Sequence, residues 1–187
     1  AWLLQAVLYA GGLTDGADPA CTVTLPSSHV DFGPVGVAPG AGYVRDGGGP
    51  FDSAKGYGWL LPAGTSLASR SRTCGAAEKQ KTFVFSSTVQ TWEIEASTGD
   101  YDVTLSVGDC SYAQGPHRVL VEGDLVVDNE STATGQFIVR ARKVRVSDGR
   151  LTVQIGGGGG NTMVNFVDVN PASTQPVKVV SVNFQAV

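Results

Sequence analysis

The sequence predicts an all-β protein, a sandwich of antiparallel strands. Three observations lead to this fold class. Short runs of strand-type residues are separated by turn signals at near-regular spacing, no segment shows a long helical period, and glycine is frequent, with 25 of 187 residues. Charged residues make up only 16% of the chain, and the 42% apolar share is enough for one hydrophobic core. The length therefore fits one domain with extensions at its ends.

We place the sandwich at residues 28–170, with an extension or linker at 1–27 and a linker from 171 onward. The tail repeats, at Val182-Asn183-Phe184, the pattern of Val30-Asp31-Phe32. It is either the start of a following module or a last strand of this domain, and the Pro-flanked linker favours the module. The apolar start of the chain, about ten residues, is too short to span a bilayer and lacks the basic region of a signal peptide. We expect the chain to be a piece of a longer protein.

The first strand is expected at residues 30–32, because Gly33 and Pro34 follow it directly. Residues 36–72 have neither helical period nor strand alternation and are predicted to form loops, with Pro62 and Gly64 excluding a helix. Residues 75–81 suit one helical turn. Strands follow at 82–85 and 92–95, and Trp92 is expected in the core.

The clearest strand pattern lies at residues 100–107. Apolar side chains alternate there with polar ones, as in a half-buried antiparallel strand. A second loop at 108–116 precedes strands at 117–122, 136–139 and 144–146. Asp148-Gly149 then predicts a hairpin between 144–146 and 151–155. Five glycines at 156–160 form a loop before the closing strand, 161–169.

Three cysteines occur, Cys21, Cys74 and Cys110. Cys74 and Cys110 both lie beside loops of the middle region and are the first choice for a disulfide, which would indicate an oxidising compartment. The alternative is three buried reduced cysteines. No Cys or His spacing indicates zinc.

The net charge of −4 argues against nucleic acid as a partner, and no further segment indicates a membrane. A local basic cluster is interpreted as a solvated strand face, with a polyanionic glycan as the alternative; its members are Arg140, Arg142, Lys143, Arg145 and Arg150. Asn129-Glu130-Ser131 is a formal glycosylation sequon.

Residues 42–72 form the densest group of exposed-type aromatics, glycines and charges, which is typical of a binding face on a rigid scaffold. Aromatic rings stack on the C–H face of a pyranose, carboxylates accept hydrogen bonds from vicinal hydroxyls, and arginines pair with uronate or sulfate. The candidate ligand-binding residues are Tyr43, Asp46, Tyr57, Trp59, Arg70, Arg72, Asp109, Tyr112, His117 and Arg118.

Structural roles compete with several of these. Trp59 also suits a plug at one end of the sandwich, and Asp109 suits a turn residue or a calcium ligand. One arginine of Arg70-Ser71-Arg72 is expected to bridge an acidic residue within the loops. His117, after Gly-Pro, is more typical of a hydrogen-bonded structural histidine.

An ordered set of short motifs carries a family resemblance across about residues 30–169. The motifs are Val30-Asp31-Phe32-Gly33, Gly42-Tyr43-x-x-Asp46, Gly56-Tyr57-Gly58-Trp59, Arg70-x-Arg72, Gly99-Asp100-Tyr101-Asp102-Val103, Gly108-Asp109, His117-Arg118-Val119, Asp148-Gly149-Arg150-Leu151 and Asn165-Phe166-Val167-Asp168. This set resembles malectin-like and galactose-binding-like modules. The resemblance implies a jelly-roll sandwich that binds carbohydrate without catalysis, often with a structural calcium, although no calcium signature is legible here. The cysteines, the glycine run and the apolar start depart from the pattern.

The sequence therefore predicts a non-catalytic carbohydrate-binding module in a larger protein that is secreted or displayed on a cell or virion surface. The first alternative is a structural or adhesion repeat whose loops contact other proteins. The second is a polysaccharide-active enzyme with Asp46, Asp109 and His117 as acid and base groups. No Gly-x-Ser-x-Gly elbow or phosphate-binding loop supports other chemistry.

Overall fold

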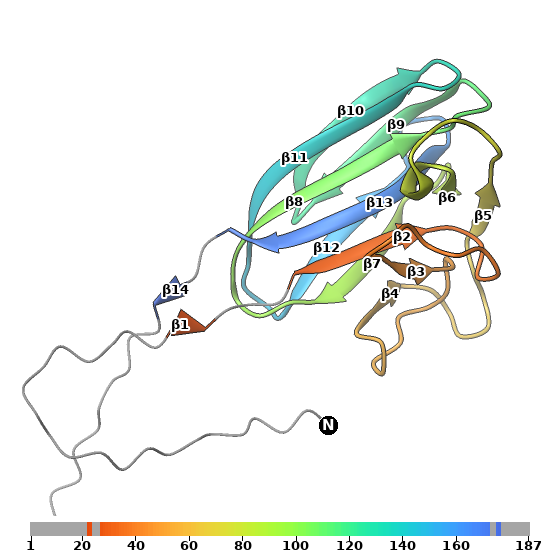
Figure 1. Ribbon diagram of the computed structural model, residues 1–187. Coiled ribbons are helices and arrows are strands. Elements are labelled where there is room, and N and C mark those ends of the chain that lie inside the picture. The colour runs from red at the N-terminus through yellow and green to blue at the C-terminus, as the bar shows by residue number, and fades with distance from the viewer. Residues whose placement is uncertain (1–21, 24–26, 173–174, 177–187) are drawn as a thin grey trace, which may run out of the picture.

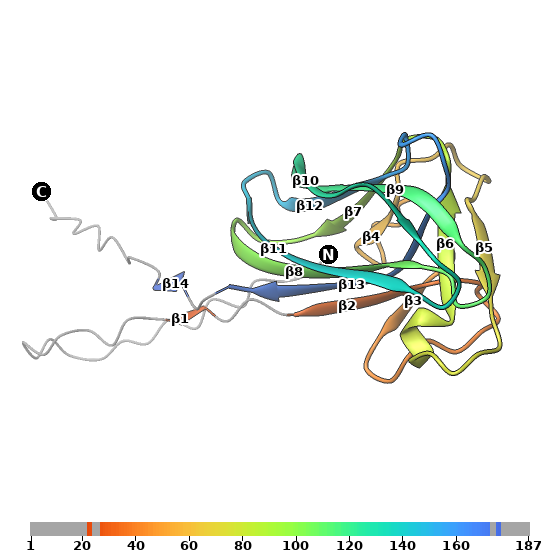
Figure 2. The same cartoon turned by 90° about the horizontal axis from the view of Figure 1, so that it is seen from above.

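The computed structural model describes residues 22–23, 27–172 and 175–176, and it confirms the predicted antiparallel β-sandwich (Figure 1). Two sheets face each other, and Figure 2 shows the two layers from above. The helical segment within the described ranges is a short 3-10 helix, η1 (Glu78–Gln80), inside the predicted helical turn.

The first sheet has five strands that pair antiparallel in the order β10-β9-β12-β7-β4. Their bounds are β4 (Tyr57–Trp59), β7 (Gln90–Glu95), β9 (Gln114–Val121), β10 (Asp124–Thr132) and β12 (Arg150–Ile155).

The second sheet has seven strands, with the main order β11-β8-β13-β2-β3. These are β2 (Ser28–Phe32), β3 (Val44–Asp46), β8 (Gly99–Gly108), β11 (Phe137–Val146) and β13 (Thr162–Pro171). The first part of β13 also pairs with β6 (Thr82–Ser86), and β6 pairs with β5 (Ala68–Ser71). The β2–β3 pair is parallel, whereas the other pairs of this sheet are antiparallel.

Two short strands lie outside the sandwich sequence: β1 (Thr22–Val23) pairs antiparallel with β14 (Gln175–Pro176). Segments before and after the sandwich are thereby joined to each other. The predicted repeat at Val182–Phe184 and the apolar start of the chain lie outside the described residues.

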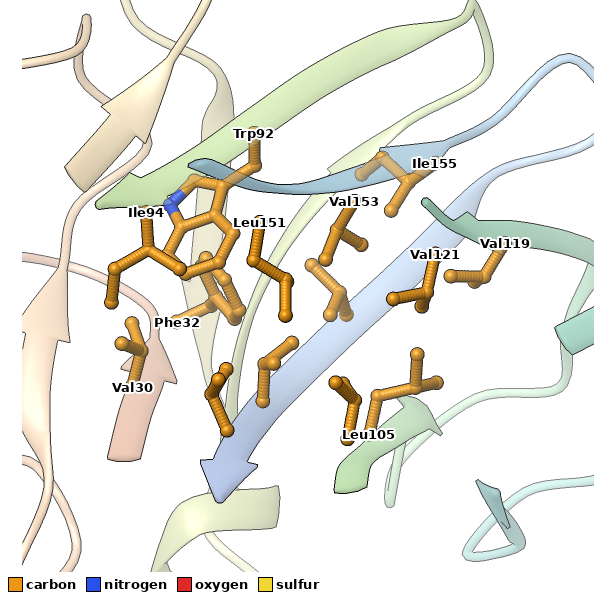
Figure 3. Close-up of a cluster of buried hydrophobic side chains, with 14 of the residues drawn as sticks. Val30, Phe32, Trp92, Ile94, Leu105, Val119, Val121, Leu151, Val153 and Ile155 are labelled. Carbon is orange, nitrogen blue, oxygen red and sulfur yellow. The ribbon is translucent and has the colours of Figure 1, made fainter. Parts of the chain in front are cut away.

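The core fills the space between the two sheets, and Figure 3 shows side chains from both layers meeting there. In β8 the predicted alternation is confirmed, because Tyr101, Val103, Leu105 and Val107 are all buried. Trp92 is also buried, as expected. Alternate burial along facing strands is what a sandwich requires, since each strand presents every second residue to the core.

The predicted hairpin at Asp148-Gly149 is wrong. β11 pairs with β8, whereas β12 pairs with β7 and β9 in the opposite sheet. The residues do make a tight turn, in which the Asp148 carboxylate accepts a hydrogen bond from the Arg150 amide at 3.1 Å. Four Cα steps of about 3.5 Å are enough to cross the roughly 10 Å between facing sheets. The Asp-Gly pair thus predicted the turn correctly, but it did not indicate which strand β12 pairs with.

Three other elements differ from prediction. The sequence does not predict β10, because the middle of this strand is polar. In the structure its pairing with β9 is interrupted by three register irregularities. The two runs at 136–139 and 144–146 belong to one strand, β11. The predicted loop region 36–72 contains β3, β4 and β5, which are too short to show alternation.

A buried carboxylate ties the loop region to the core. Asp46, at the end of β3, accepts hydrogen bonds from the indole N–H of Trp59 at 3.2 Å and of Trp92 at 2.8 Å, and from the Gly48 amide at 2.7 Å. Its exposed fraction is 4%, and burial raises its pKa while these donors oppose the rise. Both tryptophans also pack edge-on against Phe32. Asp46 therefore connects the second sheet to β4 and β7 of the first.

We predict that Asp46→Ala lowers the free energy of unfolding by about 3–5 kcal/mol, because two buried indole donors lose their acceptor. Urea denaturation measures this change. The matched control is Asp102→Ala, an exposed aspartate on β8, which should change stability by no more than about 0.5 kcal/mol. Equal effects of the two substitutions would contradict the assigned role of Asp46.

Candidate functional site

Loops gather at the end of the sandwich opposite to the start of β2 and the end of β13 (Figures 1 and 2). Two of these loops follow β5 and β8. A disulfide between Cys74 and Cys110 joins them, with a Cα–Cα distance of 6.4 Å, and confirms the predicted pair. Cys21 lies outside the described residues. The disulfide fixes the two loops relative to each other.

Arg72 and Asp109 hold the same two loops together by charge. The Arg72 guanidinium donates to both oxygens of the Asp109 carboxylate, from Nε to Oδ1 at 3.0 Å and to Oδ2 at 3.1 Å, and from Nη2 to Oδ2 at 2.8 Å. Asp109 is fully buried and also accepts the Ser111 amide at 2.8 Å. The hydrogen bonds that Arg72 donates to Asp109 raise the pKa of Arg72, so the guanidinium stays protonated. Of Arg70 and Arg72, it is thus Arg72 that has the expected structural role. Asp109 holds its loop in place by accepting hydrogen bonds from Arg72 and the Ser111 amide.

An aromatic ring stands over this ion pair. The guanidinium carbon of Arg72 lies 5.0 Å from the ring centroid of Tyr112 and 5.2 Å from that of Phe83. Tyr112 remains 59% exposed. A cation packed between two rings restrains both of them, so the exposed phenol ring is held in place before any ligand arrives.

Arg70 extends the same surface along β5. Its guanidinium lies 5.4 Å from the ring centroid of Phe85 and donates to the Ser69 carbonyl at 2.8 Å. Within the described ranges it has no acidic partner. Its remaining donors therefore face solvent next to Phe85. We call the group of Arg70, Arg72, Phe85 and Tyr112 the distal surface.

A cavity of about 380 Å³ adjoins the distal surface, because the disulfide forms part of its wall. Gln80 of η1 and Phe137 of β11 also line it. The cavity offers an amide group and an aromatic ring next to the loop that carries Tyr112.

Two further candidates lie inside the protein. Trp59 is 1% exposed, so it fills one end of the sandwich as a structural residue and is not available for ligand contact. His117 is fully buried: its Nδ1 accepts the Met163 amide at 3.4 Å, so Nε2 is the nitrogen that donates to the Thr132 hydroxyl at 3.1 Å. Burial lowers the pKa of His117 to about 4, which keeps the ring neutral. With Asp46, these residues are enclosed, and none presents its side chain to a ligand.

The remaining candidates are dispersed. Tyr43 bonds through its hydroxyl to Lys79, and its ring lies 5.4 Å from that of His29 on the outer side of β2. The Tyr57 hydroxyl donates to the Arg45 carbonyl at 3.2 Å. Arg118 lies half-buried on β9. Of the ten predicted residues, the structure brings together Arg70, Arg72, Asp109 and Tyr112. Sequence reasoning missed Phe85, whose only signal was its place in a strand.

The residues of the enzymatic alternative make separate hydrogen bonds. Asp46 binds two tryptophans, Asp109 binds Arg72, and His117 binds Thr132. They do not bond to one another.

Four of the five members of the basic cluster are paired with acidic residues, and the exception is Lys143, which has no ion-pair partner among the described residues. Arg140 contacts Glu130 at 2.8 Å, and Arg142 contacts Asp124 at 2.9 Å. Arg145 and Arg150 have partners as well, Asp100 and Glu93. This neutralisation favours the solvated strand face over a polyanion site.

Residues 22–23, 27–172 and 175–176 contain neither a cluster of metal-ligand side chains nor a long apolar helix. No group of three or more His, Cys, Asp or Glu side chains is arranged there to hold a metal ion. No helix of these ranges is long and apolar enough to cross a membrane.

Comparison with known proteins shows a shared fold and a distant sequence relative. No family model matches the chain. The chain is 28% identical over 156 residues to β-agarase A of Zobellia galactanivorans. The aligned region covers 83% of this chain and 28% of the agarase. The chain therefore spans about a quarter of that relative.

Solved structures share the sandwich. The YXIM protein of Bacillus subtilis matches with a TM-score of 0.59 and 22% identity over 82% of this chain and 42% of that one. The ANXUR2 extracellular domain of Arabidopsis thaliana has a TM-score of 0.56 and 12% identity (80% and 49% covered). A Bacteroides uniformis β-glucuronidase matches with a TM-score of 0.53 and 10% identity, over 79% of this chain and 18% of that one. The likeness to these structures shows the fold.

Titration of His117 predicts a pH dependence of stability. In the unfolded chain His117 takes up a proton as the pH falls through 6.5, whereas in the folded protein it stays neutral down to about 4. The unfolded state binds more protons in this window, so the contribution of His117 is complete above 6.5 and declines by about 3 kcal/mol toward pH 4. The difference in unfolding free energy between wild type and His117→Gln should fall by that amount from pH 7 to pH 4. A constant difference would contradict the buried neutral state.

The disulfide predicts one free thiol, from Cys21, when the unfolded protein is titrated with a thiol reagent without reductant. Removing the bridge in Cys74→Ser/Cys110→Ser should lower stability by about 2–4 kcal/mol, because a loop of 36 residues is no longer closed. Urea denaturation with and without dithiothreitol provides the control, since the double variant should not respond to reductant. Three free thiols in the wild type would overturn the pairing.

Proposed function

We propose that this domain binds carbohydrate without catalysing a reaction and directs a larger extracellular protein to a polysaccharide. The observation that carries the proposal is Tyr112, an exposed aromatic ring that is already held in position. Arg72 supports one side of the ring, and the buried Asp109 fixes Arg72. Preorganisation of this kind reduces the ordering cost of binding.

The distal surface offers the two kinds of contact that sugars use. The Tyr112 ring stacks on the C–H face of a pyranose and excludes water from neighbouring hydrogen bonds. The exposed donors of Arg70 bind hydroxyl, ether or carboxylate oxygens, and Phe85 provides apolar area beside them.

The relatives support a carbohydrate-related role. The sequence relative is named an agarase, and this chain spans only 28% of it, which is consistent with one module of a multi-domain protein. The disulfide supports a secreted or surface location, because such bonds persist in oxidising compartments. The start of β2 and the end of β13 lie at the opposite end from the distal surface (Figure 1), so further domains attached there leave this surface free.

Affinity for a single chain should be modest. One exposed ring and a few hydrogen bonds remove little surface from water, and association costs several kcal/mol. Repeated copies in a larger protein, or repeated epitopes on a polysaccharide, raise the overall affinity by multivalency.

We predict that Tyr112→Ala strongly weakens retention of the domain on its polysaccharide, because the loss of the ring removes the stacking contact of the distal surface. The measurement is a depletion assay against agarose, cellulose, xylan and pectin, each with and without EDTA, followed by calorimetry on those that bind. Loss of binding in EDTA would add the structural calcium that the family resemblance implies.

The matched control is Leu125→Ala, which removes an exposed apolar side chain from β10 and should leave binding unchanged. Circular dichroism and urea denaturation verify that both variants fold. If the folded wild type binds none of the polymers, the protein-contact alternative takes precedence, with self-association as its first test. Turnover of any polymer by the wild type would overturn the non-catalytic role.

A further inference from the structure

A groove lies between residues of β2 and β3 in one sheet and residues of β4 and β7 in the other. It continues to the end of the sandwich at the turns 96–97 and 148–150. Figure 1 shows where these strands lie. The groove consists of two cavities, of about 450 and 500 Å³. They share Ser28, Ile94 and Glu95 as lining residues, so they adjoin each other. The groove is separate from the distal surface, with which it has no lining residue in common.

Each cavity contains a tyrosine that is fixed by its hydroxyl group. Tyr57 donates to the Arg45 carbonyl at 3.2 Å, and its ring lies 6.4 Å from that of the buried Trp92. Tyr101 donates to the Ser97 carbonyl at 2.9 Å. Tyr101 and Ile94 are buried and support the wall of the groove from the core, while the half-buried Tyr57 presents its ring to the groove in a position that does not depend on a ligand.

Glu95 supplies a hydrogen-bond acceptor that the protein leaves free. Among the described residues its carboxylate has neither a hydrogen-bond nor an ion-pair partner. The Glu95 amide donates to the Gly56 carbonyl at 2.7 Å, which fixes the backbone from which this exposed side chain extends. A side chain at Gly56 would crowd this carboxylate, since a Cβ there would lie 3.3 Å from Oε2. Glycine thus keeps the space beside Glu95 open.

The basic side chains of the groove are all engaged with acids. His29 bonds to Asp168 at 2.9 Å, and Arg150 bonds to Glu93 at 2.6 Å. Lys55 lies 3.8 Å from Asp52. An anionic ligand would therefore find no unpaired cation here, while a ligand with hydroxyl donors finds the Glu95 carboxylate.

We infer that this groove is a second saccharide site, which takes a neutral oligosaccharide by stacking on Tyr57 and by hydroxyl donation to Glu95. The inference rests on the proposed carbohydrate-binding function and adds a second, chemically different site to it. A groove of two adjoining cavities suits an extended chain of sugars. With the distal surface at the far end, one domain contacts two segments of a polysaccharide at once.

The test uses agarose oligosaccharides of defined length and the whole chain, measured by calorimetry and by ¹⁵N NMR. The wild type should show amide shift changes at Ser28, Gly56 and Glu95. Glu95→Gln should weaken oligosaccharide binding about tenfold, because charge-assisted hydrogen bonds become neutral ones. Glu130→Gln is the matched control on the other edge of the sandwich and should leave the affinity unchanged.

The outcomes separate the second site from the proposed function. Glu95-dependent binding that persists in Tyr112→Ala supports two independent sites. Binding that is lost in Tyr112→Ala, unaffected by Glu95→Gln and without shifts in the groove overturns the second site but not the function. If no oligosaccharide or polymer binds at all, both proposals fall.

Discussion

The hydrogen bonds between the Asp46 carboxylate and the indole groups of Trp59 and Trp92 are the interaction on which the arrangement of this protein depends. β3 and β4 have three residues each, too few to pair strongly by themselves. A buried charge is costly unless it is fully bonded, so a carboxylate with two indole donors and a backbone amide admits few other geometries. The two tryptophans then fill the end of the core beside Phe32, and the long loops between β2 and β6 are held against the sandwich.

The same principle recurs where the loops carry exposed side chains. Asp31 bonds to Arg45, Thr82 and the Gly40 amide, and Asp109 bonds to Arg72 and the Ser111 amide. Both carboxylates are buried and each receives several donors. The aspartates of the loop region thus provide rigidity, and contact with a ligand is left to the side chains around them. This division explains how a domain with little regular structure in its loops presents Tyr112 in a defined position.

The two proposed sites differ in what surrounds them. The distal surface has the Arg70 guanidinium, without an acidic partner among the described residues, next to the half-buried Phe85 ring, and its exposed Tyr112 ring depends on a disulfide and an ion pair between loops. The groove has a carboxylate without a partner among the described residues, that of Glu95, next to Tyr57, and these two residues lie on the strands β7 and β4. A site on strands is more rigid than one on loops. The groove is accordingly the better candidate for selecting a particular sugar sequence, and the distal surface for contacting a polymer broadly.

The sequence by itself determined the sandwich, the inward face of β8, the buried Trp92 and the Cys74–Cys110 pair, because alternation, turn chemistry and loop position are local properties of a chain. It also pointed to the aromatic and charged residues of the loops. Only the tertiary structure decided which of them face solvent: Asp46, Trp59 and His117 occur in the same kind of local sequence as Tyr112, yet they are buried. It also decided that β12 leaves β11 for the opposite sheet, and that the Glu95 carboxylate has no partner among the residues that the structure describes. Burial and pairing depend on segments far apart in the chain, and no local pattern encodes which of those segments meet.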